Sequence, residues 1–545
     1  AGELPHSFSI PASELKQLIE LRTDLRNPNL QRSRWSELHR KAAELTRALV
    51  HVQIVSAFSE VFEGLTEKEL IHRVQQVGVF FYEVEFPEVF FDEQGKLRPN
   101  AGFDVIVGNP PWEEPAAEYK QFLPEFDPDY RELSGKASEK REKELLKDPE
   151  IKRRWEAYEQ SVKDYKALLS SGWYQHQSRK VRGRMPGAHT NLYKYATELS
   201  WQLLKNDSRA GLVLDGGLWG DLAASGLRKL LLDQSSGTAF CGFTNNRGIF
   251  PDVHRSYKFG ACVFRKGGRT EVLHAVFMRD SLDALASFDG LAVAIPADDV
   301  RNNPRDNYPV PEVRNEEHYR AERFLTSHPS LIEEPWNIDT YSRELNAGEQ
   351  RDYFLDEPRA GYYPLVEGQQ FNLFGVHQGN LPVNWLNPSD KGAGGFLRDK
   401  QRGRILDAIA EHLESKGKLK GGKQSAALAW VRSITRKKGI PDEWVHLDWD
   451  GYRIAWRDVA RNDDRRTLIA AILPPKVGVS HTAPFVRPFQ MQVKGESIVW
   501  SLQYPHEQLL YLAGVLSSFC CDAIARSRVS KMHLQSQIFQ SLHVP

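Results

Sequence analysis

The sequence predicts an α/β fold built on a doubly wound sheet, and two observations support this prediction. Short apolar runs typical of buried strands occur at 103–108, 211–214, 240–243, 257–264 and 271–277. Amphipathic helical patterns at 192–204 and 222–232 alternate with these runs. Such alternation is typical of a sheet with helices packed against it.

Three domains are expected along the chain. Residues 1–78 show apolar residues at helical spacing and predict a helical N-terminal segment. Residues 79–332 contain the sheet, which is expected to begin with a strand at 79–86 that ends at Pro87. A strongly charged stretch at about 115–189 predicts a solvated helical insertion in this region. Residues 333–545 are rich in Trp, Tyr, Pro and Gly with weak periodicity, and predict a mixed α+β domain.

Bulk properties exclude few classes of protein. The 545 residues carry a formal net charge of zero, which neither supports nor excludes nucleic-acid binding, because a basic groove can lie on a neutral protein. Four cysteines show no metal-binding spacing, so no metal site is expected, and the pattern fits a cytoplasmic protein. No apolar run is long enough to predict a membrane span. Residue 1 is Ala rather than Met, which suggests part of a longer polypeptide.

The segment after the first predicted strand, Asn109-Pro110-Pro111-Trp112, carries the most chemical information. Two prolines remove two backbone donors, so the strand cannot continue and a rigid loop follows. In open α/β sheets, ligands bind at this end of the strands. The plain alternative is a simple turn, since Asn and Pro are common turn residues.

This loop suits a planar base with an exocyclic amine. N6 of adenine is a poor nucleophile because its lone pair is delocalised into the ring. The side-chain oxygen of Asn109 and the carbonyl of Pro110 can accept the amine hydrogens and favour a pyramidal nitrogen, while Trp112 can stack on the base. Such a reaction requires the base to leave the duplex and depends on positioning and hydrogen bonding.

The segment FDVIVGNPPW at 103–112 resembles the catalytic motif of adenine-specific (N6) DNA methyltransferases. Weaker resemblances to large bacterial enzymes of this kind follow in the right order, at 81–90, 190–194, 208–214, 248–251, 257–259, 363–368, 465–474, 529–534 and 542–545. These enzymes include methylases of type IIG restriction-modification systems and of phage-defence systems such as BREX and DISARM. The resemblance implies the C-terminal part of a Rossmann-like methyltransferase sheet, followed by a target-recognition domain that binds double-stranded DNA.

The resemblance also implies site residues. Asn109, Pro110, Pro111, Trp112 and Phe250 correspond to catalytic positions, with Phe250 packing on the flipped base. Asn109 and Pro111 would also face the cofactor, S-adenosylmethionine. Phe250 could instead be an ordinary core residue, because Phe before Pro at a strand edge often is.

One family feature is missing. No glycine-rich loop for S-adenosylmethionine precedes the catalytic motif. The segment 390–396 (DKGAGGF) is the main downstream candidate, and a flexible or DNA-facing loop is the preferred interpretation there. The cofactor loop is therefore expected in a missing N-terminal segment or in a partner subunit. A second glycine-rich segment, at 216–220, is expected to be a post-strand loop near the base.

Basic residues in the last domain are candidates for DNA contacts. They are Lys416, Lys418, Lys420, Arg453, Arg457, Arg465 and Arg466. They would position the DNA backbone without reading sequence. The alternative is a solvated face.

Two other functions stay open. The chain could be a non-catalytic DNA-recognition or scaffold module. Asn-Pro-Pro-aromatic loops also occur in methyltransferases that act on RNA or on protein glutamine.

Overall fold

The computed structural model describes residues 10–177, 191–302, 308–373, 375–376, 384–419, 422–460, 464–529 and 533–545. The chain divides into two compact units, Ala1–Val310 and Pro311–Pro545. Each unit is described separately. The fold is a mixture of helices and mixed sheets, which confirms the predicted α/β class. The assignment of roles to the three expected domains stays a prediction.

Unit 1 begins with three helices, as the sequence predicts. They are α1 (Ala12–Leu25), α2 (Arg32–Phe58) and α3 (Glu67–Val77). Thr66 and Glu69 form a capping box at the start of α3, and Gly78 ends it in the left-handed conformation. Apolar side chains of α1, α2 and α3 share one core with β1 residues Phe103 and Ile106.

The strand predicted at 79–86 is wrong. Two short helices, α4 (Tyr82–Glu85) and α5 (Pro87–Phe90), occupy this segment instead. Phe81 and Val84 are buried three residues apart, which is helical spacing, while Phe80 is exposed. Pro87 lies in the first turn of α5, where its missing amide hydrogen costs nothing.

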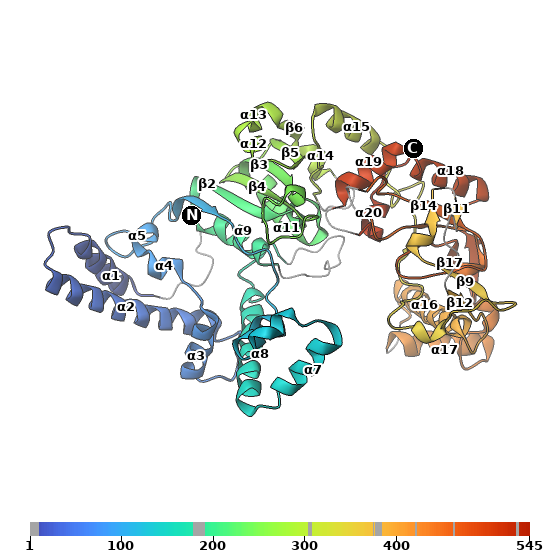
Figure 1. The fold of residues 1–545 in the computed structure, drawn as a ribbon, viewed down its shortest axis with the longest axis horizontal. Helices are drawn as coiled ribbons and strands as arrows, with labels where there is room; N and C mark the ends of the chain where they lie inside the picture. The colour runs from blue at the N-terminus through green and yellow to red at the C-terminus, as the bar shows by residue number, and fades with distance from the viewer. Residues whose placement is uncertain are drawn as a thin grey trace. The chain divides into compact units, whose positions relative to one another are not determined.

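A six-stranded sheet forms the centre of unit 1 (Figure 1). The strands are β1 (Phe103–Gly108), β2 (Leu204–Asp215), β3 (Ser235–Thr244), β4 (Lys258–Lys266), β5 (Val272–Arg279) and β6 (Val293–Pro296). Their order is β1-β2-β4-β3-β5-β6. The pairs β1–β2 and β3–β5 are parallel, and the other three pairs are antiparallel. The strand runs predicted at 103–108, 211–214, 240–243, 257–264 and 271–277 are therefore confirmed.

Helices cover one face of this sheet. On that face Leu212, Phe264, Phe240 and Leu273 are buried. The helix α11 (Ser225–Asp233) and the helix α9 (Leu192–Leu203) pack there against β3 and β2. These two helices confirm the predicted helical patterns.

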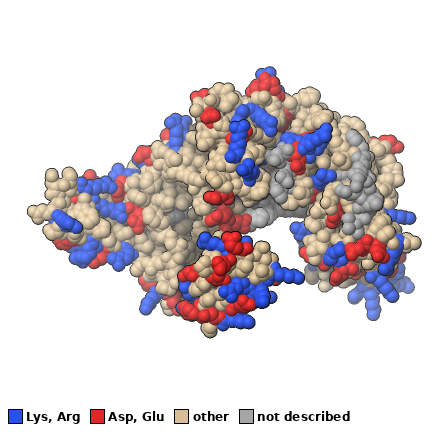
Figure 2. Space-filling view, in the orientation of Figure 1, with Lys and Arg blue, Asp and Glu red and all other residues tan. Residues whose placement is uncertain are grey.

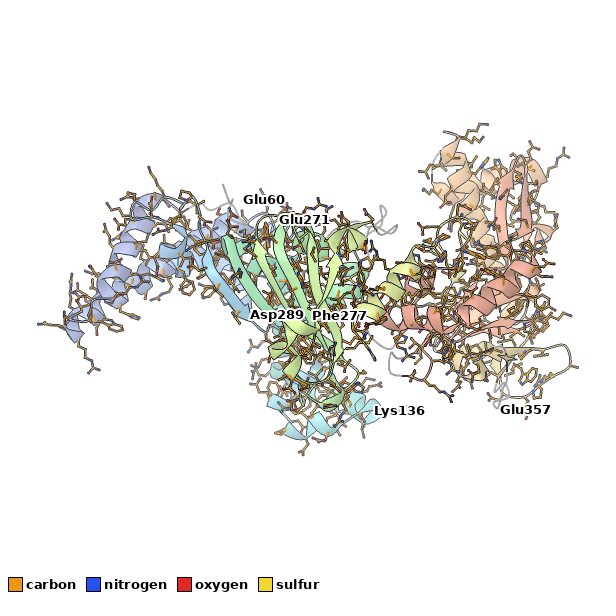
Figure 3. All side chains as sticks on the ribbon, turned by 90° about the horizontal axis from the view of Figure 1, so that it is seen from above. Glu60, Lys136, Glu271, Phe277, Asp289 and Glu357 are labelled. Atoms are coloured by element: carbon orange, nitrogen blue, oxygen red, sulfur yellow. The ribbon has the colours of Figure 1, made fainter. Side chains whose placement is uncertain are left out.

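The opposite face is open in its middle. One paired residue from each strand lies in a single row across it: Val107, Gly211, Val263, Ala239, His274 and Ala294. All six are exposed or half-buried. Figure 3 shows the strands side by side, with Glu271 and Phe277 near the two ends of β5. On the edge strand β1, Val105 is 63% exposed and Val107 is 80% exposed.

The charged stretch between β1 and β2 is helical, as predicted. It contains α6 (Tyr119–Phe122), α7 (Gly135–Leu145) and α8 (Pro149–Leu169). Phe122, Tyr130 and Trp155 lie in a small core of its own. An ion pair between Arg73 of α3 and Asp164 of α8 joins the insertion to the N-terminal helices.

Several shorter elements complete unit 1. They are α10 (Gly217–Gly220), α12 (Asp283–Ala286), α13 (Phe288–Leu291) and α14 (Ala297–Arg301). Short 3-10 helices lie at Leu123–Glu125, Pro128–Glu132, Leu222–Ala224 and Asn245–Arg247.

Unit 2 mixes small sheets with helices. Its helices are α15 (Glu316–Thr326), α16 (Ala393–Ser415), α17 (Lys423–Thr435), α18 (His506–Leu516), α19 (Phe519–Arg528) and α20 (Ser536–Gln540). Its 3-10 helices lie at Arg351–Tyr353, Gly368–Gln370, Asp442–Trp444 and Asp448–Asp450. Trp456 stacks on Phe539 in its core, with ring centroids 3.9 Å apart.

The strands of unit 2 are short. One four-stranded sheet has the order β15 (Gly478–Val479), β9 (Tyr363–Val366), β12 (Asn384–Leu386) and β8 (Phe354–Leu355). A second four-stranded sheet has the order β14 (Ala470–Leu473), β13 (Arg453–Trp456), β16 (Phe485–Val486) and β7 (Thr340–Tyr341). Two hairpin pairs are β10 (Phe371–Asn372) with β11 (Gly375–Val376), and β17 (Phe489–Lys494) with β18 (Ser497–Leu502).

No single helix among the described residues is long and apolar enough to cross a membrane. The bent pair α18–α19 passes that test of length and composition only when its two helices are taken together, across an angle of 66°. In the same described ranges, no group of three or more His, Cys, Asp or Glu side chains is arranged to hold a metal ion.

Candidate active site

The loop after β1 presents an unengaged amide. Asn109 directly follows the strand and is exposed, as is Pro111, while Pro110 and Trp112 are half-buried. Among the described residues, the side chain of Asn109 has no hydrogen-bond partner. Its oxygen and nitrogen thus bond none of the residues that the structure describes, and the side chain is exposed.

Three hydrogen bonds fix the chain just beyond Asn109. The indole Nε1 of Trp112 donates to the carbonyl of Val213 on β2, at 3.3 Å. The Asn191 side chain donates to the carbonyl of Trp112, at 3.2 Å, and the amide of Leu192 donates to the carbonyl of Glu113, at 2.9 Å. The loop is thus held by β2 and by the start of α9.

The structure brings Phe250 and Trp112 together, although they are far apart in the sequence. Their ring centroids lie 5.4 Å apart in an edge-to-face arrangement at 84°. Trp112 also stacks on Phe259 of β4 at 5.8 Å, and Phe250 meets Phe259 at 4.8 Å. These aromatic geometries are favourable. Both Trp112 and Phe250 are half-buried, so each packs into this cluster and keeps part of its surface free.

Sequence reasoning missed Asn245, which lies at the end of β3. Its side chain is fully buried and bonds the backbone of Phe250 and Val253. The signal was present in the sequence, since a polar residue stands between an apolar strand and Gly248.

The loop predicted at 216–220 is wrong, because Gly217–Gly220 form the short helix α10, which packs tightly against its own neighbours. A methyl group on Gly217 would lie 2.5 Å from Oδ2 of Asp221 and 2.8 Å from the hydroxyl of Tyr193. The amide of Gly217 donates to Asp215, at 2.7 Å. Burial raises the pKa of Tyr193, and the charges of Asp215 and Asp221 raise it further. This segment is a packed support beneath the site.

The loop interpretation of 390–396 is wrong for its second half: residues 390–392 form a turn, and residues 393–396 begin helix α16. Gly394 and Gly395 donate their amides to the carbonyls of Asn387 and Ser389, so these donors already have partners. A methyl group on Gly394 would lie 1.9 Å from the carbonyl oxygen of Pro388. The glycines allow the chain to fold tightly back on itself and leave no open cradle there.

Two of the predicted DNA-binding arginines have partners inside unit 2. Arg453 is fully buried and donates to both oxygens of Glu344, at 2.7 and 3.1 Å. Arg466 donates to the carbonyls of Ser517 and Ser518. The fully buried Arg453 is therefore an interior contact and cannot reach DNA, whereas Arg466 is half-buried and its DNA contact stays a prediction.

The other basic candidates lie nearer the surface. Lys416, Lys418 and Arg465 are exposed. Arg457 is half-buried and donates to the carbonyl of Gly368, at 2.9 Å. Lys420 lies outside the described residues. Figure 2 shows acidic and basic side chains mixed on the visible surface, which agrees with ion pairs such as Lys423–Glu414 near this region.

No protein-family model matches the chain, and no curated protein matches it. Among solved structures, it is similar to restriction-modification enzymes. For the type IIG restriction endonuclease BpuSI, the TM-score is 0.28 with 16% identity over 70% of this chain and 44% of that chain. For a nuclease-deletion mutant of the type ISP enzyme LlaGI, in complex with a DNA substrate mimic, the TM-score is 0.32 with 10% identity over 95% and 41%.

A third solved structure is the type IIL enzyme MmeI in complex with DNA, with a TM-score of 0.30 and 10% identity over 66% of this chain and 50% of that chain. The chain spans half or less of the length of these three proteins.

Proposed function

We propose that this chain contributes the base-binding half of a DNA adenine-N6 methyltransferase that belongs to a restriction-modification or phage-defence system. The observation that carries the proposal is the unengaged amide of Asn109 at the end of β1, next to a Trp112 that is clamped in an aromatic cluster. S-adenosylmethionine is the proposed methyl donor, and double-stranded DNA is the proposed substrate.

The proposed chemistry uses few groups. The Asn109 oxygen and the Pro110 carbonyl accept the two hydrogens of the adenine amine. Hydrogen bonds fix the chain directly after these two acceptors, at Trp112 and Glu113, which limits how far the loop must move when charge develops on the nitrogen. Trp112 and Phe250 contact the base after it leaves the duplex, and such stacking contributes about 1–3 kcal/mol per base. Lys416, Lys418 and Arg465 are the proposed backbone contacts.

The described residues do not fit the cofactor. The glycines at 216–217 and 392–395 are packed against their own neighbours and leave no cradle for a nucleoside. Asn109 and Pro111 are exposed and could face the donor, but nothing described beside them would hold it. We therefore assign the cofactor-binding half of the site to an additional polypeptide segment or a partner subunit.

The sheet of unit 1 supports this assignment. The row from Val107 to Ala294 is open, so this face of the sheet has room for an additional element. The edge strand β1 also leaves one side unpaired in the sheet, and exposed edges are available for strand addition. A strand added parallel to β1 would end beside Asn109.

The test is made in the cells that naturally contain the protein. Host DNA is hydrolysed and N6-methyladenine is quantified by mass spectrometry, for the natural gene and for Asn109→Ala. The expected result is loss of the modification attributable to this gene. Asn29→Ala is the matched control, because it changes an exposed asparagine of unit 1 between α1 and α2. Retention of the modification in Asn109→Ala contradicts the proposal.

The same samples separate the other substrate classes. Modified nucleosides in RNA and methylated glutamine in protein are measured in parallel. If Asn109→Ala lowers methylation of RNA or of protein glutamine and leaves DNA methylation unchanged, then RNA or protein, and not adenine in DNA, is the substrate. If methylation of DNA, RNA and protein is unchanged in Asn109→Ala, the result favours a non-catalytic DNA-recognition module.

A further inference from the structure

Asn245 lies where β3 ends and is fully buried. Its side-chain nitrogen donates to the carbonyl of Phe250 at 2.9 Å and to the carbonyl of Val253 at 2.7 Å. Its side-chain oxygen accepts the amide of Phe250 at 2.9 Å. One side chain therefore binds both backbone polar groups of Phe250.

The backbone of Asn245 closes the same loop. Its amide donates to the carbonyl of Tyr257, and its carbonyl accepts the amide of Gly248 at 2.7 Å. Gly248 has a φ of 71°, a conformation that other residues rarely adopt. Asn245 thus connects the two ends and the middle of the loop between β3 and β4 through its hydrogen bonds.

Other contacts also hold this loop: Ile249 packs in the same apolar cluster as Phe250, and Arg247 forms an ion pair with Asp280 at 3.0 Å. Pro251, Asp252, His254 and Arg255 are exposed, so the loop has no core of its own on that side. Phe250 is half-buried against Trp112 and Phe259. Its position depends on those ring contacts and on the Asn245 amide.

We infer that Asn245 is a positioning residue that holds Phe250 against Trp112 and so fixes the aromatic wall that receives the extruded base. This inference rests on the proposed function. Asn245 acts through Phe250 and has no contact with the reacting atoms. The geometry is specific to an asparagine: an aspartate keeps the size but replaces two donated hydrogen bonds with repulsion between its carboxylate and two carbonyls.

The first experiment needs no methyl transfer. Hydrogen exchange of the loop 246–257 is measured by mass spectrometry on the full chain, for the natural protein, Asn245→Asp and Asn245→Ser. Asn29→Ala is the control, since its side chain is exposed and lies outside this loop. We expect exchange in this loop to be about 10-fold faster or more in both Asn245 variants, as for the loss of hydrogen bonds worth roughly 1 kcal/mol each. Unchanged exchange overturns the inference.

The second experiment connects the loop to the reaction. Methylation rates are compared for Asn245→Asp, Phe250→Ala and the double variant. We expect kcat to fall about 10-fold or more in Asn245→Asp, and we expect no further fall when Phe250 is already Ala. Full additivity of the two changes overturns the inference, because Asn245 would then act independently of Phe250.

The two arms separate the inference from the proposed function. If the natural protein shows no methylation, the proposed function fails, and the exchange arm still decides whether Asn245 holds Phe250. If methylation is present and Asn245→Asp leaves kcat unchanged, the positioning role fails alone.

Discussion

The indole nitrogen of Trp112 donates a hydrogen bond to the carbonyl oxygen of Val213, across the pair β1–β2. This bond joins the loop that begins with Asn109 to the neighbouring strand. It also orients the indole so that its ring stacks on Phe259. The position of the loop is therefore set by the sheet.

Replacing Trp112 with Phe should separate the hydrogen bond from the ring contacts. Phe keeps an aromatic ring against Phe259 and loses the bond to Val213. We expect methylation to fall about 10-fold, and the free energy of unfolding to fall by roughly 1 kcal/mol. Trp112→Ala should be more damaging in both measurements, because the stacking is lost as well. Equal activities of the two variants would contradict a role for the ring.

Breaking the buried ion pair of unit 2 should destabilise the protein. Glu344 accepts two hydrogen bonds from Arg453 and one from the amide of Val479. We expect Glu344→Ala to lower the free energy of unfolding by about 3–5 kcal/mol, because it leaves an unpaired buried charge. Denaturant titration measures this change. The double variant Glu344→Met with Arg453→Met should recover most of the loss, and failure to recover would contradict this explanation.

Exposed lysines should affect DNA binding without affecting stability. We expect Lys416→Ala and Lys418→Ala to weaken DNA binding similarly for all sequences. Each should reduce the slope of log affinity against log salt by about 0.9 if it contacts a phosphate. Fluorescence anisotropy over a range of salt concentrations measures the slope. An unchanged slope in both variants would remove this surface from the proposed DNA contacts.

His543 should make the protein sensitive to mild acid. Burial lowers the pKa of His543 from 6.5 to about 4, and the nearby charge of Arg528 contributes to the decrease. Its Nδ1 donates to the carbonyl of His328, at 2.6 Å. The unfolded chain takes up the proton near pH 6.5 and the folded chain only near pH 4. Stability is therefore full above pH 6.5 and falls as the pH decreases toward 4.

Denaturant titrations at several pH values test this prediction. We expect the free energy of unfolding of the natural protein to decrease between pH 6.5 and 4. His543→Gln should show a shallower decrease, because glutamine does not titrate. His506→Gln, at an exposed position in the same unit, should retain the natural slope. Identical slopes for the natural protein and His543→Gln would show that another group is responsible.

The sequence predicted the strands of the sheet because each is an apolar run with local turn signals. It failed at 79–86, where Phe81 and Val84 are buried by helices distant in the chain. Pro87 was interpreted as a strand terminator, but it begins a helix. Periodicity over eight residues cannot separate these cases when tertiary contacts decide which side chains are buried.

The sequence predicts the part of the candidate site whose residues are consecutive in the chain. Asn109 to Trp112 are consecutive, and their loop follows a strand as expected. Arg453 illustrates the opposite case, because its partner Glu344 lies 109 residues earlier and no local pattern indicates the pair. Asn245 bonds residues only five and eight positions ahead. It could have been found by asking which polar side chain closes the loop before β4.

The open sheet face has a practical consequence for handling the protein. Val105 and Val107 lie on β1, which pairs with β2 on one side and has no strand among the described residues on the other, and Val263 extends the exposed apolar surface inward. Such surfaces promote self-association. The chain produced alone should therefore precipitate or form oligomers as its concentration rises, and co-expression with the companion polypeptide that we propose should raise the soluble yield. A charged residue in place of Val107 should improve the solubility of the chain produced alone. The same substitution should prevent the companion from binding, so that co-expression no longer raises the soluble yield.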